Sequence, residues 1–236
     1  MPIIYTKNDN NLSTYVNMLN TVYRDGTNNH LEHNDNPLYW DLLLGEVKSN
    51  PTNWENKIAL DFGCGKGRNV TNMLSLANFK RVDGIDISED NIKYCKETYT
   101  NQPSEFYKNS GKDLSSLKND EYDFIMSTIV FQHICVHELR YKIKEEIYRI
   151  LKSDGIFSFQ MGYGDISFAG HTNPKAYYEN YYEAFNSNGS NDVRVADESE
   201  LISDLENIGF KNIKFEIHEP WLDGGHPNWI YVTCKK

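Results

Sequence analysis

The feature that most restricts the fold is an apolar run that ends in a glycine-rich turn. Residues 57–62 (KIALDF) are followed by GCGKG at 63–67, and an amphipathic segment occupies 69–76. This order predicts a buried parallel strand, a tight turn and a helix. Glycines let a ligand approach the main chain closely, and the first turn of the helix presents unbonded N–H groups. We therefore expect a ligand at the end of this strand.

An acidic residue follows at the distance expected of a nucleoside site. Asp86 lies near the end of the next apolar run, 81–87 (RVDGIDI), 19 residues beyond Gly67. A carboxylate here can accept hydrogen bonds from both hydroxyls of a ribose. The alternative is that Asp86 only caps the helix that begins after Ser88. Because the glycine turn and the acid occur together, we adopt the ribose interpretation.

The glycine spacing argues against a dinucleotide ligand. The dinucleotide fingerprint is G-x-G-x-x-G, whereas this turn runs G-x-G-x-G, with Arg68 where the third fingerprint glycine would stand. Asp61, at the strand end, would repel a pyrophosphate but attract a cationic amino group, directly or through water. These residues favour a nucleoside that carries an amino acid over NAD.

Apolar runs alternate with helical patterns along most of the chain, which predicts a mostly parallel, doubly wound α/β sheet. The further expected strands are 105–109, 122–130, 155–160, 211–218 and 229–234, and the expected helices are 15–22, 38–47, 69–76, 90–99, 138–151 and 198–208. Neither an internal repeat nor a linker of domain length is evident. We expect one domain with four parts: an N-terminal helical cap (1–56), a cofactor-binding core (57–161), a substrate-cap insertion (162–197) and a closing helix with strands (198–236).

Charge and cysteine content exclude several classes of protein. The chain has 34 acidic and 24 basic residues, a net charge of -10, and no basic patch. Such a surface repels phosphate backbones, so we expect no nucleic acid partner. No apolar stretch is long enough to span a bilayer and no secretory leader is evident, which predicts a cytoplasmic protein with no membrane partner. The four cysteines lack zinc-site spacing, and we expect no metal.

Five segments, in this order, resemble the motifs of the class I S-adenosylmethionine-dependent methyltransferases, in their small-molecule branch. They are LDFGCGKG (60–67), GIDIS (84–88), GKDL (111–114), YDFIMSTIVFQHI (122–134) and RILKSDG (149–155). Asp154 stands where the family usually has glycine, a departure that should affect only the turn. The resemblance implies a Rossmann-like, seven-stranded, mostly parallel sheet with an antiparallel last strand and a helical, aromatic cap. It also implies S-adenosyl-L-methionine as the cofactor.

The resemblance also implies a set of cofactor-binding residues. They are Asp61, Gly63, Cys64, Gly65, Gly67, Asp86, Ile87, Asp113, Leu114, Ser127 and Thr128. Asp61, Gly63 and Gly65 would line the methionine moiety, with Gly67 at the entry to the helix, and Asp86 would hold the ribose.

The remaining members of the set would contact the base and the sulfonium. Asp113 would accept a hydrogen bond from the adenine amino group, and the Leu114 backbone would read the ring edge. Ser127 and Thr128, at the end of the fourth strand, would face the sulfonium region, because ligands collect at that end of such sheets.

Methyl transfer is an in-line displacement at carbon, so alignment of the reactants alone contributes roughly 7–11 kcal/mol. A base is needed only when the acceptor arrives protonated. His133, which follows the fourth strand, is the candidate catalytic residue, because a neutral imidazole can remove or orient an acceptor proton. The alternative is that His133 supports the loop or the cofactor. The Asn-Pro-Pro-Tyr and Pro-Cys signatures of DNA base methylation are absent after this strand.

The segment 162–197 is the expected specificity element, since it contains an aromatic set suited to enclosing a small organic acceptor. The set is Tyr163, His171, Tyr177, Tyr178, Tyr181, Tyr182 and Phe185. The alternative is a lid whose tyrosines only pack on the domain. Asp223 and His226, in the loop between the last two strands, would also lie on the ligand side. With His171 they lack any spacing that indicates a metal site.

These observations predict a methyltransferase that acts on O or N of a small-molecule acceptor. Three other interpretations stay open: a non-catalytic cofactor-binding accessory or sensor protein, an RNA-modifying methyltransferase and an NAD-dependent oxidoreductase. The sequence does not identify the acceptor or the oligomeric state.

Overall fold

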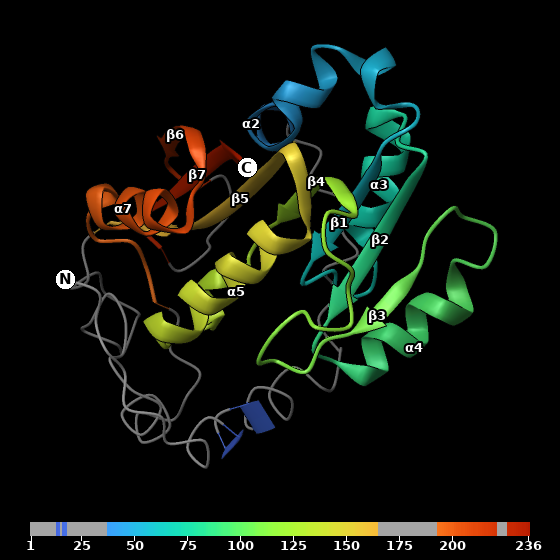
Figure 1. The fold of residues 1–236 in the computed structure, drawn as a ribbon, viewed down its shortest axis with the longest axis horizontal. Helices are drawn as coiled ribbons and strands as arrows, with labels where there is room; N and C mark the ends of the chain where they lie inside the picture. The colour runs from blue at the N-terminus through green and yellow to red at the C-terminus, as the bar shows by residue number, and fades with distance from the viewer. Residues whose placement is uncertain (1–12, 15, 18–36, 165–192, 221–225) are drawn as a thin grey trace.

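A computed structural model describes residues 13–14, 16–17, 37–164, 193–220 and 226–236 (Figure 1). The expected helix over 15–22, most of the aromatic segment 162–197 and Asp223 therefore fall mainly outside the described residues. Within the described part, no helix is both long enough and apolar enough to cross a membrane.

Seven strands form one sheet in the order β3-β2-β1-β4-β5-β7-β6. The strands are β1 (Ile58–Phe62), β2 (Arg81–Asp86), β3 (Phe106–Lys108), β4 (Tyr122–Ser127), β5 (Leu151–Tyr163), β6 (Lys211–His218) and β7 (Asn228–Lys235). Neighbours pair in parallel from β3 to β5, and β7 is antiparallel to both β5 and β6. The predicted Rossmann-like class with an antiparallel last strand is confirmed. The strand order reverses between β1 and β4, which is where ligands bind in such sheets.

Helices cover both faces of the sheet (Figure 1). Helices α2 (Pro37–Lys48), α3 (Arg68–Ala77) and α4 (Glu89–Thr98) pack on one face, and α5 (His137–Ile150) and α7 (Glu198–Ile208) pack on the other. Two short 3-10 helices, η1 (Pro51–Trp54) and η2 (Phe131–His133), follow α2 and β4. Helix α4 begins directly after Ser88, whose Oγ accepts a hydrogen bond from Asn91 N at 3.2 Å. Helix α7 ends at Ile208, as predicted, and Gly209 follows it with a left-handed φ of 116°.

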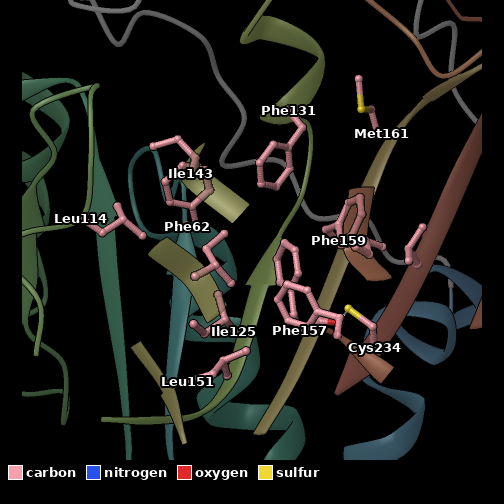
Figure 2. Close-up of a cluster of buried hydrophobic side chains, with 14 of the residues drawn as sticks. Phe62, Leu114, Ile125, Phe131, Ile143, Leu151, Phe157, Phe159, Met161 and Cys234 are labelled. Carbon is pink, nitrogen blue, oxygen red and sulfur yellow. Dashed lines mark hydrogen bonds between the residues drawn. The ribbon is translucent and has the colours of Figure 1, made fainter. Parts of the chain in front are cut away.

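An aromatic cluster joins the ends of β1 and β4 to the middle of β5 on the α5 face (Figure 2). Phe157 and Phe159 stack with their ring centroids 4.6 Å apart, and Phe131 from η2 meets Phe159 at 5.5 Å. Phe62, the last residue of β1, meets Phe131 at 5.6 Å. Because packed aromatic rings resist displacement, this cluster holds the backbone that follows β1 and β4 in a defined place.

A buried ion group joins α5 to α7. Asp204 Oδ2 lies 2.8 Å from His137 Nε2 and 3.4 Å from Lys144 Nζ. Burial lowers the pKa of Lys144, and the neighbouring Asp204 carboxylate opposes that shift. Such a group adds little net stability, but the loss of one partner leaves a buried charge unpaired. It therefore specifies how the closing helix α7 docks on α5.

Two strand boundaries differ from the prediction. Strand β4 ends at Ser127 rather than at Val130, because Ile129 adopts a left-handed φ of 58° that no strand accommodates. Strand β5 begins at Leu151 and ends at Tyr163, beyond the predicted 155–160 at both ends. It includes Asp154 at a φ of 62°, a conformation that explains why glycine is usual at this position.

Replacing Ile129 by glycine tests whether the backbone is strained there. A left-handed conformation costs an L-residue about 1–2 kcal/mol, and the unfolded-state entropy of glycine offsets roughly half of the gain. We expect Ile129→Gly to raise the free energy of unfolding in urea by about 0.5–1 kcal/mol.

The matched control is Ile217→Gly in β6. The two isoleucines are equally exposed, at 38% and 39%, but only Ile129 has a positive φ. Glycine in an extended strand should cost about 1 kcal/mol. A loss of stability in both variants would show that strain at Ile129 is not the dominant effect.

Candidate functional site

The glycine turn and the acid after β2 are in direct contact. Gly65 N donates to Asp86 Oδ2 at 2.8 Å, and Ser88 N donates to Asp86 Oδ1 at 2.8 Å. The turn is also anchored on β2, where Gly63 N donates to Ile85 O at 2.8 Å. Burial raises the pKa of Asp86, and the N–H groups of Ser88 and Gly65 oppose that shift. Both oxygens keep a lone pair for a further donor, so capping and ligand binding by Asp86 are compatible.

The glycines of the turn serve different purposes. At Gly63, with a φ of 79°, a Cβ atom would lie 2.2 Å from Val130 Cγ2, so only glycine fits beneath that side chain. At Gly65, with a φ of 51°, a Cβ atom would meet no heavy atom within 4 Å. Gly65 thus combines a left-handed backbone with open space. This is the place where a ligand can approach the main chain.

Asp61, at the end of β1, is a buried carboxylate that lacks a normal partner. It is 1% exposed, and neither oxygen has a hydrogen bond within the described part of the chain. Burial raises the pKa of Asp61 to about 7, while the nearby Arg68 charge and the Asn69 amide oppose the shift and Asp86 adds to it. Since a buried charge is costly unless it is paired, the site is suited to a ligand that brings a cationic group.

Two polar side chains near Asp61, Asn69 and Tyr39, were not predicted as site residues. Asn69 Nδ2, on the first turn of α3, donates to Thr128 Oγ1 at 2.8 Å. Tyr39, on α2, is buried; burial raises its pKa, and the Thr128 hydroxyl and Arg68 oppose that rise. The position of Asn69 two residues beyond Gly67 was a usable signal. Tyr39 carried no such signal.

The segment 111–114 lies against the end of β2, as its expected role beside the nucleoside requires. Asn109 N donates to Asp86 O at 2.7 Å. A Cβ atom at Gly111 would lie 2.9 Å from Ile87 Cδ1, so Ile87 packs directly on this segment.

The groups predicted to contact adenine are already engaged in hydrogen bonds. Asp113 Oδ1 accepts from Ser115 Oγ at 2.7 Å, and this bond lowers the pKa of Asp113. Leu114 N donates to Glu146 Oε2 at 3.1 Å, and Leu114 O accepts from Arg149 Nη2 at 3.0 Å. Reading of the ring edge by the Leu114 backbone stays a prediction, and it would require one of these bonds to be exchanged.

Ser127 and Thr128 have different surroundings. Ser127 Oγ donates to Phe62 O at 3.0 Å and so ties the end of β4 to β1. Thr128 is the member of the pair that contacts Asn69. Cys64 is buried, and its thiol donates to Gly65 O at 3.6 Å. Gly67 is the left-handed N-cap of α3.

His133, the candidate catalytic residue, is half-buried in η2, directly beyond the end of β4. Its backbone N donates to Val130 O at 2.9 Å. This position is at the same edge of the sheet as Thr128 and the glycine turn. The two interpretations of His133, as a base or as a support for the loop, both remain open.

Within the described ranges, no group of three or more histidine, cysteine, aspartate or glutamate side chains is arranged to hold a metal ion.

Comparison with known proteins gives a domain family and many similar folds. Residues 60–159 match a family model described as a methyltransferase domain. A thiocyanate methyltransferase of Brassica oleracea is 35% identical over 99 residues, which cover 41% of this chain and 42% of that protein. The chain thus matches about two fifths of the length of this curated relative.

Solved structures show the same fold at low identity. A methyltransferase of Methanosarcina mazei that is dependent on S-adenosylmethionine (SAM) superposes with a TM-score of 0.60 and 17% identity, covering 85% of this chain and 97% of the other. Another from Aquifex aeolicus gives 0.55 and 18%, covering 85% and 94%.

Replacing Asp61 by asparagine tests the raised pKa. An unfolded aspartate titrates near 4, so the folded protein holds an extra proton between about pH 4 and 7, and wild-type stability falls across that window. Asp61→Asn removes this penalty. We expect the variant to gain up to about 4 kcal/mol over wild type at pH 8 and little at pH 4.

The measurement is urea unfolding at several pH values, with Glu206→Gln, an exposed carboxylate on α7, as the control. A stability difference between wild type and Asp61→Asn that does not change with pH would contradict the assignment.

Proposed function

We propose that the chain is a class I S-adenosylmethionine-dependent methyltransferase, as the match of residues 60–159 to a methyltransferase-domain model supports, and that it transfers a methyl group from S-adenosyl-L-methionine to O or N of a small-molecule acceptor. The observation that carries the proposal is the joined pair of Gly65 and Asp86 with the unpartnered carboxylate of Asp61 beside it. Asp61 precedes the open glycine turn, and Asp86 is bonded to its middle residue. Two acids placed in this way suit a ligand with an ammonium group at one end and a ribose at the other.

The residues fit this cofactor in three places. Asp61 would pair with the ammonium group, which relieves the cost of its burial. Gly65 offers its open side to the amino-acid chain. Asp86, fixed by two backbone donors, would accept from the ribose hydroxyls. When bound, the cofactor supplies a methyl group already activated by a sulfonium.

The chemical work left to the protein is mainly alignment. Thr128 and His133 follow β4 at the ligand edge of the sheet, where an acceptor would approach the methyl group. For an acceptor that arrives protonated, the His133 imidazole would take the proton as the bond to the methyl group forms. For an acceptor already ionised, His133 would only orient it.

The charge of the chain supports a small acceptor rather than RNA. The net charge of -10 opposes the approach of a phosphate backbone. The partial match to a thiocyanate methyltransferase also suggests small acceptors and adds a sulfur-containing anion to the range worth assaying. We further propose a single domain that works in the cytoplasm, since all four cysteines are buried free thiols, as expected of a reducing compartment.

Cofactor binding tests the central assignment. We expect isothermal calorimetry to show binding of S-adenosylhomocysteine, and Asp86→Ala to weaken it at least tenfold, because a buried diol would lose its acceptor. Asp90→Ala, an exposed acid on α4, is the control. Wild-type affinity in Asp86→Ala would remove the ribose assignment. Tight NAD binding without any response to S-adenosylhomocysteine would defeat the proposed function.

Turnover tests the role of His133. A panel of alcohols, phenols, amines and thiocyanate is assayed by release of S-adenosylhomocysteine. We expect His133→Ala to turn over the best acceptor 10²–10⁴-fold more slowly, on the order of the usual contribution of a general base, with cofactor affinity retained. Unchanged turnover in the variant would end its candidacy. Cofactor binding without turnover of any acceptor would favour the accessory-protein interpretation.

A further inference from the structure

Polar side chains on both sides of Met126 lie on the sheet face that α2 covers, beginning with Asp61 of the proposed cofactor site. Asp61 of β1 is paired in register with Met126 of β4, and Met126 is paired with Ser158 of β5. Side chains two residues apart share a face, so Gln160 lies on the same face, one step nearer the ligand edge. Gln160 is paired in register with Tyr231 of β7. Ordinary strand spacings place the Cα atoms of Gln160 and Asp61 about 12 Å apart.

Gln160 has an amide that is only half satisfied. It is 4% exposed, and its Nε2 donates to Tyr231 Oη at 3.3 Å. Its Oε1 is buried and accepts no hydrogen bond from any described residue. A buried acceptor left without a donor costs about 1–3 kcal/mol. Because the bond to Tyr231 fixes the amide plane, Oε1 has a defined direction in which a donor can satisfy it.

Aromatic side chains lie on the same part of the sheet as this amide. The rings of Tyr39 and Tyr231 meet edge to face, with centroids 6.3 Å apart. His226 packs over Gly162, where a Cβ atom would lie 2.3 Å from Nδ1, and its ring meets Trp229 at 4.8 Å. Burial raises the pKa of Tyr231, so its hydroxyl stays neutral. An apolar wall with a few neutral polar groups is typical of a small-molecule subsite.

We propose that Gln160 Oε1 accepts a hydrogen bond from the methyl acceptor, which is therefore a small molecule that bears a hydroxyl or N–H donor and no negative charge. The inference rests on the proposed methyltransferase function and adds the chemical class of the acceptor. Gln160 is a specificity-determining residue in this assignment, and Tyr231 positions it. An anion would meet the partial negative charge of the Gln160 oxygen, which repels it.

The experiment measures binding of four probes to the protein saturated with S-adenosylhomocysteine, by ligand-observed NMR. Catechol and benzamide carry neutral donors, whereas benzoate and benzylamine carry a negative and a positive charge. We expect catechol and benzamide to bind the wild type, and Gln160→Leu to weaken both at least tenfold. Tyr231→Phe, which keeps the ring but frees the Gln160 amide, should weaken them less. The matched control is Ser158→Ala on the same strand and face, whose hydroxyl already meets Thr233 Oγ1 at 3.5 Å.

The affinity for S-adenosylhomocysteine, measured in each variant, separates the possible failures. If the wild type does not bind S-adenosylhomocysteine, the proposed function fails and this inference fails with it. If all variants bind it equally, but Gln160→Leu keeps wild-type affinity for catechol and benzamide, only the inference fails. Binding of neither neutral probe to the wild type also overturns it. Preference for benzoate would also overturn the inference, because it would assign the subsite to the buried cation of Arg194. Arg194 precedes Val195, which forms a β-bridge with Tyr163.

Discussion

The unpaired carboxylate of Asp61 is the constraint around which the rest of the site is arranged. Strand β1 is central in the sheet and covered on both faces, so the last side chains of the strand are removed from water. An acid in that place raises the energy of the protein in the absence of ligand. The neighbouring charge of Arg68 and the amide of Asn69 reduce this penalty without removing it. The protein thus gives up stability to hold a preformed partner for a cation, as binding sites often do.

The second acid differs because the fold satisfies it. Asp86 accepts from the glycine turn and from the start of α4, so it joins β1, β2 and α4 at one point. The distance between the two ends of the ligand is then set by the register of β1 and β2, which the packed core maintains. Little rearrangement is needed for the two acids to act together, and less ordering entropy is lost on binding.

Local patterns predicted the parts of the structure that depend on nearby residues. The β1-turn-α3 unit, the start of α4 after Ser88 and the end of α7 at Ile208 each follow from a few consecutive residues and were confirmed. The predicted end of β4 was wrong because apolar residues continue to Val130 while the backbone turns at Ile129. The hydrophobicity of a residue does not indicate its φ angle. Tyr39 and Gln160 were missed because their neighbours come from distant strands and helices. The hydrogen bonds of Leu114 to Glu146 and Arg149 are similarly non-local.

The position of β7 between β5 and β6 has a consequence for synthesis of the chain. Strands β5 and β6 both pair with β7 and not with each other. Because β7 follows β6 in the sequence, β5 and β6 are synthesised before the strand that joins them. Until residues 228–235 emerge, β5 has an open edge and β6 has no native place in the sheet. Unpaired edges of this kind promote aggregation. Native closure of this side of the sheet therefore waits for the final strand, and a nascent chain that stalls before it should depend on chaperones.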